Sequence, residues 1–176
     1  MQEKYAKKPF RISLAAMFAA FTLICLYLAA ILPTGRISFY FLSSIFVAAL
    51  LVEDQPGIAI LMFIAVGGLG LLIVPNLMLV LPYVLLFGHY GIGKYFIEKI
   101  RDKVTAFVLK LIYFDVFLAL IYFLVFDQLA GEMLKNLPVW ALIVLSQVAF
   151  VIYDFLYSKL TVFYVKVIRK RLMAGG

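Results

Sequence analysis

Positions 59–93 form an uninterrupted run of 35 residues without a single Asp, Glu, Lys or Arg. A helix crosses the hydrocarbon core of a bilayer with about 17–25 residues, so this run is too long for one crossing. Pro75 and Asn76 divide it, because this residue pair is typical of a turn between two apolar segments. The run therefore predicts two consecutive transmembrane helices joined by a short turn.

The chain as a whole is also strongly apolar. Hydrophobic residues make up 66% of the sequence and charged residues 14%, against about 45–50% and about 25% in soluble domains. Lipid is the solvent that such a surface requires. Apolar runs bounded by charged, Pro or Gly residues predict six helices, at positions 12–32, 37–52, 57–74, 77–92, 104–126 and 137–165. We expect an all-α membrane protein, a six-transmembrane-helix bundle that forms a single domain over residues 1–176.

The Lys and Arg residues sort to one side of the expected membrane. With six crossings, 12 of the 16 basic residues fall on the side of the N-terminus and only Arg36 and Lys135 on the other. Lys110 and Lys159 lie within helices. Basic residues are retained on the cytoplasmic side, so both termini are expected there, in a multi-pass protein of the cell (inner or plasma) membrane. The net charge of +7 is then explained by topology and contact with anionic lipid, not by nucleic-acid binding.

The first expected helix carries two pairs of small residues at four-residue spacing. Ala15 pairs with Ala19, and Ala16 pairs with Ala20. This spacing places each pair on one helical face, where small side chains let another helix approach closely in lipid. The partner is either another subunit or another helix of the same bundle.

Residues 7–20 read Lys-Lys-Pro-Phe-Arg-Ile-Ser-Leu-Ala-Ala-Met-Phe-Ala-Ala. This stretch resembles the first helix of S components, the substrate-binding membrane subunits of energy-coupling factor (ECF) vitamin transporters. The glycine-rich segment at Gly67, Gly68 and Gly70 is also similar to the family pattern, as is a last helix in which Asp154 is followed by a basic end. The resemblance extends over the whole chain as a pattern of helices and small residues.

The resemblance implies a function without catalytic residues. An S component captures a vitamin or related small metabolite, and its Ala-x-x-x-Ala motif packs against a transmembrane coupling subunit. ABC-type ATPases, as partner subunits, supply the energy for uptake. A non-transport membrane scaffold of the MreD type, a cell-shape protein of similar size and helix number, is the main alternative.

A polar stripe on the sixth helix suggests where a small molecule binds. Trp140, Gln147, Asp154 and Thr161 recur every seven residues, and Asn76 and Tyr83 repeat this spacing in the fourth helix. Residues at this spacing share one helical face. The outer members and the arginine of the first external loop match a small-molecule pocket, which is mostly apolar with a few placed polar groups. The expected substrate-binding residues are Arg36, Asn76, Tyr83, Trp140 and Gln147, with hydrogen bonding between helices as the alternative.

Two acids and two lysines lie inside the expected spans. Asp115 and Asp154 are at matching depth, and so are Lys110 and Lys159. Ionisable groups in a membrane are costly and usually pair with one another. Structural ion pairing among Lys110, Asp115, Asp154 and Lys159 is therefore expected. Lys110–Asp115 and Asp154–Lys159 can face each other across two antiparallel helices, which would also let Lys110 pair with Asp154. The alternative is an intramembrane hydrolase that uses the two acids.

Residues 88–95 nearly match a nucleotide-binding loop of the form G-x-x-x-x-G-K-[ST]. Tyr95 stands where Ser or Thr should hold the metal, and the segment ends a membrane helix instead of following a strand. His89 is the only histidine, whereas a metal site needs several convergent ligands. No nucleotide, metal or other cofactor is expected.

Overall fold

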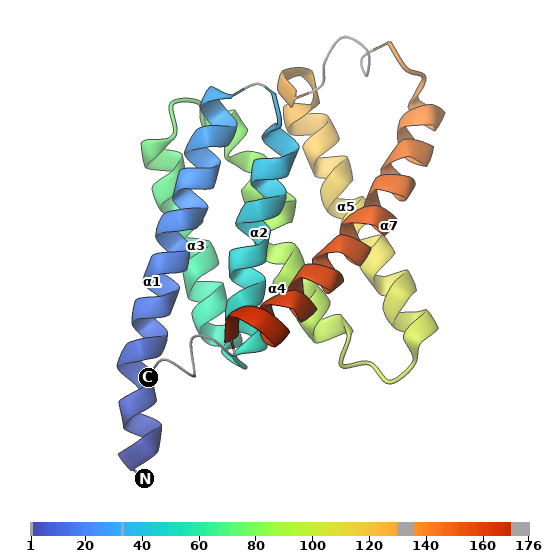
Figure 1. Ribbon diagram of the computed structural model, residues 1–176. Helices are drawn as coiled ribbons and strands as arrows, with labels where there is room; N and C mark the ends of the chain where they lie inside the picture. Colours follow the sequence, from blue (N-terminus) through green and yellow to red (C-terminus); the bar gives the residue numbers. More distant parts are fainter. Residues whose placement is uncertain (1, 33, 130–135, 170–176) are drawn as a thin grey trace.

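The computed structural model describes residues 2–32, 34–129 and 136–169, and its regular structure over these residues is helical throughout (Figure 1). The elements are α1 (Gln2–Ile31), α2 (Arg36–Val52), α3 (Pro56–Ile73), η1 (Leu77–Leu79), η2 (Tyr83–Phe87), α4 (Gly88–Ile97), α5 (Lys103–Leu129), α7 (Val139–Phe163) and η3 (Tyr164–Arg169). A 3-10 turn, a π-helical segment and α4 together form the fourth crossing. The expected all-α bundle of six helices is confirmed.

Five segments are long and apolar enough to cross a bilayer. They are Ile12–Ile31, Pro56–Ile73, Leu77–Ile97, Lys103–Leu124 and Val139–Val167, and they contain 18 to 29 residues each. The 17-residue α2 is shorter, but at 1.5 Å per residue it still extends for roughly 25 Å. The chain is a multi-pass α-helical membrane protein.

Local chemistry explains where several helices begin. Pro56 occupies the first position of α3, where its missing N–H costs nothing. Gly35 precedes α2 with φ of 88°, a left-handed conformation that glycine adopts without strain. Asp102 caps α5 by accepting a hydrogen bond from the Thr105 backbone N–H at 2.9 Å. The hydrogen bonds from the Thr105 hydroxyl and backbone hold the pKa of Asp102 below its usual value.

Two helices run at least five residues further than the sequence predicted. The first begins at Gln2 instead of position 12, and the fourth crossing continues to Ile97 instead of ending at position 92. The glycines that suggested an end are packing positions inside a continuous helix. A Cβ on Gly91 would lie 1.8 Å from the Tyr157 hydroxyl oxygen, and a Cβ on Gly93 would lie 2.7 Å from the Tyr113 ring.

Successive crossings alternate in direction, so α1 begins and η3 ends at the same end of the bundle (Figure 1, lower end). Lys99 and Arg101 lie in the connection from α4 to α5 at this end, which we call the basic end. Arg36 starts α2 at the opposite end. Lys135, Lys170 and Arg171, which also entered the charge count, lie outside the described residues.

Helix α2 occupies the centre of the bundle. It packs against α1, α3, α4 and α7, and one apolar cluster joins it to α1 and α3 through Leu26, Val47 and Val66. A second, aromatic cluster joins it to α4, α5 and α7. Tyr90 is fully buried in this second cluster, with its ring 4.8 Å from that of Tyr153.

Helices α5 and α7 expose most of their surface. In the most apolar stretch of each helix, only 17% of α5 and 6% of α7 is buried inside the protein. The two helices diverge toward the upper end in Figure 1. Their exposed side chains are mainly large and apolar, as expected of faces that contact lipid.

Candidate functional site

Four charged side chains meet near the basic end. Lys94 of α4 and Lys110 of α5 both bind Asp154 of α7, and the Lys110 Nζ lies 2.8 Å from Asp154 Oδ2. Glu98, directly after α4, bridges the same lysines at 3.2 Å from Lys94 and 3.1 Å from Lys110. The cluster is electrically neutral and links three helices that are distant in sequence.

Hydrogen bonds complete this cluster. The Tyr90 hydroxyl donates to Asp154 Oδ1 at 2.7 Å, and Lys94 donates to the Ser158 hydroxyl at 2.8 Å. The side chains of Lys94, Lys110 and Asp154 are only 7%, 9% and 14% exposed. The Lys94 ammonium group donates hydrogen bonds to Asp154 and Ser158 and forms an ion pair with Glu98. A buried charge is tolerated only when it is paired and hydrogen-bonded in this way.

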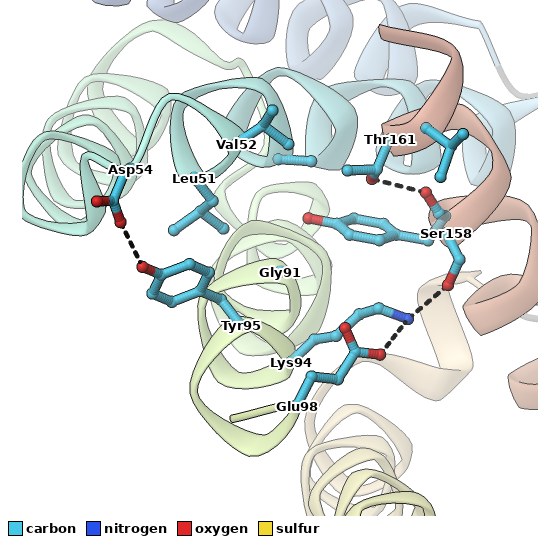
Figure 2. Close-up of a pocket in the computed structure, with 12 residues that line it drawn as sticks. Leu51, Val52, Asp54, Gly91, Lys94, Tyr95, Glu98, Ser158 and Thr161 are labelled. Carbon is cyan, nitrogen blue, oxygen red and sulfur yellow. Dashed lines mark hydrogen bonds and ion pairs between the residues drawn. The ribbon is translucent and has the colours of Figure 1, made fainter. Parts of the chain in front are cut away.

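Next to the cluster is a cavity of about 420 Å³ between α2, α4 and α7, which we call the basic-end cavity (Figure 2). Helix α2 and the turn after it supply one wall, α4 supplies the second and α7 the third. Its lining residues are Ala48, Leu51, Val52, Asp54, Gly91, Lys94, Tyr95, Glu98, Tyr157, Ser158, Thr161 and Val162.

Two polar groups stand out in this lining. Asp54 has a left-handed backbone with φ of 54°, which Asp and Asn tolerate better than most residues. Its carboxylate accepts a hydrogen bond from the Tyr95 hydroxyl at 2.8 Å (Figure 2). The Tyr157 hydroxyl is buried and has no hydrogen-bond partner among the described residues.

Two of the four residues expected to form ion pairs pair with each other in the structure. Lys110 contacts Asp154 across the two helices, whereas neither Lys110 with Asp115 nor Asp154 with Lys159 forms an ion pair in the described part of the chain. Residues five apart on a helix point about 140° away from each other, so pairs along one helix are geometrically unfavourable. Lys159 instead lies 5.3 Å from the centroid of the Phe155 ring.

The two acids have separate partners. Asp115 accepts a hydrogen bond from the Gln147 amide at 2.8 Å, which links α5 to α7. Asp154 is held by two lysines and a tyrosine. This arrangement favours structural roles over the paired acids that an intramembrane hydrolase would need.

The expected substrate-binding residues do not surround one cavity. Tyr83 is fully buried in the core, whereas Trp140 is 69% exposed near the start of α7. Asn76 accepts a hydrogen bond from the Met78 backbone N–H at 3.0 Å and thereby caps η1. None of these three residues lines the basic-end cavity.

The other two members of that set also lie elsewhere. Gln147 is engaged with Asp115, and Arg36 is the first residue of α2 at the opposite end of the bundle from the cavity. The seven-residue spacing along each helix had grouped these residues. In the structure, the orientation of each helix about its axis directs their side chains to different neighbours. Of the polar stripe on the last helix, only Thr161 lines the basic-end cavity, together with the neighbouring Ser158.

The sequence offered only an indirect signal for the remaining cavity residues. Lys94 and Gly91 belong to the segment that nearly matches a nucleotide-binding loop, but this segment is helical. Asp54 and Tyr157 carried no recognisable pattern. They meet because α2, α4 and α7 pack together near the basic end.

The two alanine pairs of α1 face different surroundings. Ala15 is 8% exposed and belongs to the core, and Ala19 is partly buried against the same core. Ala16 and Ala20 are exposed. The first pair packs within the bundle, and only the second is open to another protein.

Both ring nitrogens of His89 are hydrogen-bonded within the bundle. Its Nε2 donates to the Leu85 carbonyl at 2.5 Å, and its Nδ1 accepts from the Tyr113 hydroxyl at 2.6 Å. Within the described residues no group of three or more His, Cys, Asp or Glu side chains is arranged to hold a metal ion.

The fold defines the class as a multi-pass helical membrane protein with a polar cluster and a cavity between its helices. Comparisons with protein-family models, curated proteins and solved structures give no match for this chain.

Proposed function

We propose that the protein is the substrate-binding S component of an ECF-type transporter in the cell membrane. It would capture a vitamin or related small metabolite and deliver it by docking against a transmembrane coupling subunit with ABC-type ATPases. The observation that carries this proposal is the exposed Ala16 and Ala20 pair on a six-crossing bundle.

These alanines form a notch in an otherwise bulky helix face. Ile12, Ala16, Ala20 and Ile24 follow one another at four-residue spacing, and all four are exposed. Lipid would accept large side chains at all four positions equally well. Two methyl groups between two isoleucines instead allow the backbone of a partner helix to come close, which is how membrane helices associate.

The position of the notch suits docking at the energised side. It lies in the half of the span Ile12–Ile31 that is nearer to the basic end, where the positive-inside rule places the cytoplasm. Under this proposal the partner subunits hydrolyse ATP, and this chain contributes binding and docking without a catalytic residue. The charged cluster keeps α4, α5 and α7 together during transport.

Co-purification tests the proposal directly. The chain would be co-expressed with the coupling subunit and ATPases of its own cell, and the recovered complex quantified for wild type and for Ala16→Leu/Ala20→Leu. We expect at least a tenfold loss of complex, which corresponds to about 1.4 kcal/mol of association free energy. The isolated double variant should keep its thermal stability within about 0.5 kcal/mol, because both positions are exposed.

Matched controls separate docking from folding. Ala65→Leu on α3 and Ala149→Leu on α7 enlarge exposed alanines elsewhere and should leave the complex intact. Ala15→Leu/Ala19→Leu should lower the stability of the isolated protein, because Ala15 is a core residue. If morphogenetic proteins co-purify in place of ATPases, the scaffold interpretation replaces the transporter.

A further inference from the structure

We propose that the basic-end cavity binds a small organic ammonium ligand, a primary amine with an apolar body. This inference goes beyond the proposed function, since binding is a property of the isolated chain whether or not it docks against a coupling subunit. Size, hydrogen-bonding capacity, charge and one unpartnered hydroxyl each point to this ligand class.

The cavity has the size and wall chemistry of a small-molecule site. Its volume of about 420 Å³ lies within the roughly 300–1,000 Å³ of such pockets, which are mostly apolar with a few polar groups. Leu51, Val52 and Val162 provide aliphatic surface, and Tyr95 and Tyr157 provide aromatic rings (Figure 2). A ligand needs an apolar body to cover these walls.

The lining has few free donors. Lys94 donates hydrogen bonds to Asp154 and Ser158 and forms an ion pair with Glu98. The Tyr95 hydroxyl donates to Asp54, and the Ser158 hydroxyl donates to the backbone carbonyl of Asp154 at 2.8 Å. The Thr161 hydroxyl donates to the backbone carbonyl of Tyr157 at 2.8 Å. Only the Tyr157 hydroxyl proton is uncommitted.

The lining keeps spare acceptors. The bonds given above use one oxygen each of Asp54 and Glu98, so the second oxygen of each carboxylate is left. The hydroxyl oxygen of Thr161 also retains a lone pair. Because the free capacity consists almost entirely of acceptors, the complementary ligand is a donor.

The charges around the cavity favour a cationic ligand as the hydrogen-bond donor. The cavity and its adjoining cluster contain three carboxylates (Asp54, Glu98, Asp154) and two ammonium groups (Lys94, Lys110). These five groups together carry one net negative charge, and the carboxylates Asp54 and Glu98 are exposed.

Ring contacts of nearby lysines support an ammonium ligand. Lys99 places its Nζ 4.2 Å from the centroid of the Tyr95 ring, and Lys94 lies 5.7 Å from that of Tyr157. Both rings thus already accept ammonium groups through cation–π contact. Lys99 is exposed, so water and salt screen its repulsion of an incoming cation.

Tyr157 supplies an independent observation. Its side chain is among the cavity lining, the residue is 3% exposed, and its hydroxyl has no hydrogen-bond partner in residues 2–32, 34–129 and 136–169. The hydroxyl lies against the backbone of Gly91, another lining residue. A buried hydroxyl without a partner is unfavourable, and an ammonium ligand that donates to this oxygen would remove the penalty.

Calorimetry on the purified full-length chain in detergent tests the ligand class. The probes are 2-phenylethylammonium, the neutral analogue 2-phenylethanol and the anionic analogue 3-phenylpropionate, which share one apolar body. We expect the amine to bind about tenfold more tightly than the alcohol, as a charge-assisted hydrogen bond implies. The carboxylate should bind more weakly than the alcohol.

Two substitutions with matched controls locate the site. Asp54→Asn should weaken amine binding about tenfold while keeping its left-handed backbone, and Glu53→Gln, at an acid outside the lining, should leave binding unchanged. Tyr157→Phe should weaken amine binding about threefold. Tyr153→Phe, one turn away on α7, should leave amine binding unchanged. The affinity of 2-phenylethanol should change less than twofold in Asp54→Asn.

The proposal is overturned if the three probes bind equally, if the amine does not bind, or if Asp54→Asn and Tyr157→Phe leave its affinity unchanged. None of these results bears on the co-purification assay, since the alanine notch of α1 is not part of the cavity lining. A failure of the ligand class and a failure of the transporter proposal can therefore be told apart.

Discussion

Replacing Asp154 with alanine removes the carboxylate that links α4, α5 and α7. Its two oxygens bind Lys94, Lys110 and the Tyr90 hydroxyl. After the substitution Glu98 is the remaining acid for both lysines, at 3.2 and 3.1 Å. Its side chain is 47% exposed, so solvent screens much of its attraction.

The expected loss of stability follows from this burial. Removing one partner of a buried ion pair costs about 3–5 kcal/mol, because the other charge is left without compensation. The side chains of Lys94 and Lys110 are only 7% and 9% exposed, so both charges are nearly buried. Since Glu98 and Ser158 still contact the lysines, we expect Asp154→Ala to lower the free energy of unfolding by about 3 kcal/mol, the low end of this range. In a chain of 176 residues this lowers the melting temperature by roughly 6–12 °C.

Thermal unfolding followed by far-ultraviolet circular dichroism in detergent measures this loss. The variants are Asp154→Ala, Lys110→Ala, the double variant, and Lys159→Ala as a control. Lys159 is exposed and contacts only the Phe155 ring among the interactions seen, so its loss should cost less than about 1 kcal/mol.

The double variant decides whether the two residues interact. Because Lys110→Ala removes one stranded charge, the double variant should lose at least about 1 kcal/mol less than the sum of the single losses. Strictly additive losses would refute the direct pairing of Lys110 with Asp154. A loss for Lys159→Ala as large as that for Asp154→Ala would refute the argument from burial.

Two further predictions concern packing and topology. Gly91→Ala should lower the free energy of unfolding by about 1–3 kcal/mol, because its Cβ would lie 1.8 Å from the Tyr157 hydroxyl oxygen. Gly68→Ala is the control, since its Cβ would meet nothing within 4 Å, and equal losses for the two variants would contradict the packing argument. For the topology, a single cysteine is placed at Lys99 or at Asn136 of an otherwise cysteine-free protein, which is then labelled in intact cells. The cysteine at Lys99 should resist an impermeant thiol reagent, and the one at Asn136 should react. The opposite labelling would invert the topology.

Much of the architecture could be predicted from the sequence. The charge-free run at 59–93 required two crossings, and the turn at Pro75 and Asn76 separates α3 from η1. The depths of Lys110 and Asp154 along their helices indicated that they could meet across α5 and α7, which the structure brings to 2.8 Å. Such properties depend on position along a helix axis, and position along the axis is a simple count of residues.

The sequence by itself determined the number of crossings, the side on which the basic residues collect and the depth of each polar group. Only the tertiary structure decided which alanine pair of α1 faces outward and that Lys94 joins Asp154. It alone brings Asp54 and Tyr157 to one cavity. The physical reason is that hydrophobicity distinguishes lipid from water but not lipid from protein interior, since both are apolar. The rotation of each helix about its axis is set by the packing of side chains such as Tyr157 against Gly91, which appears only once the helices are assembled.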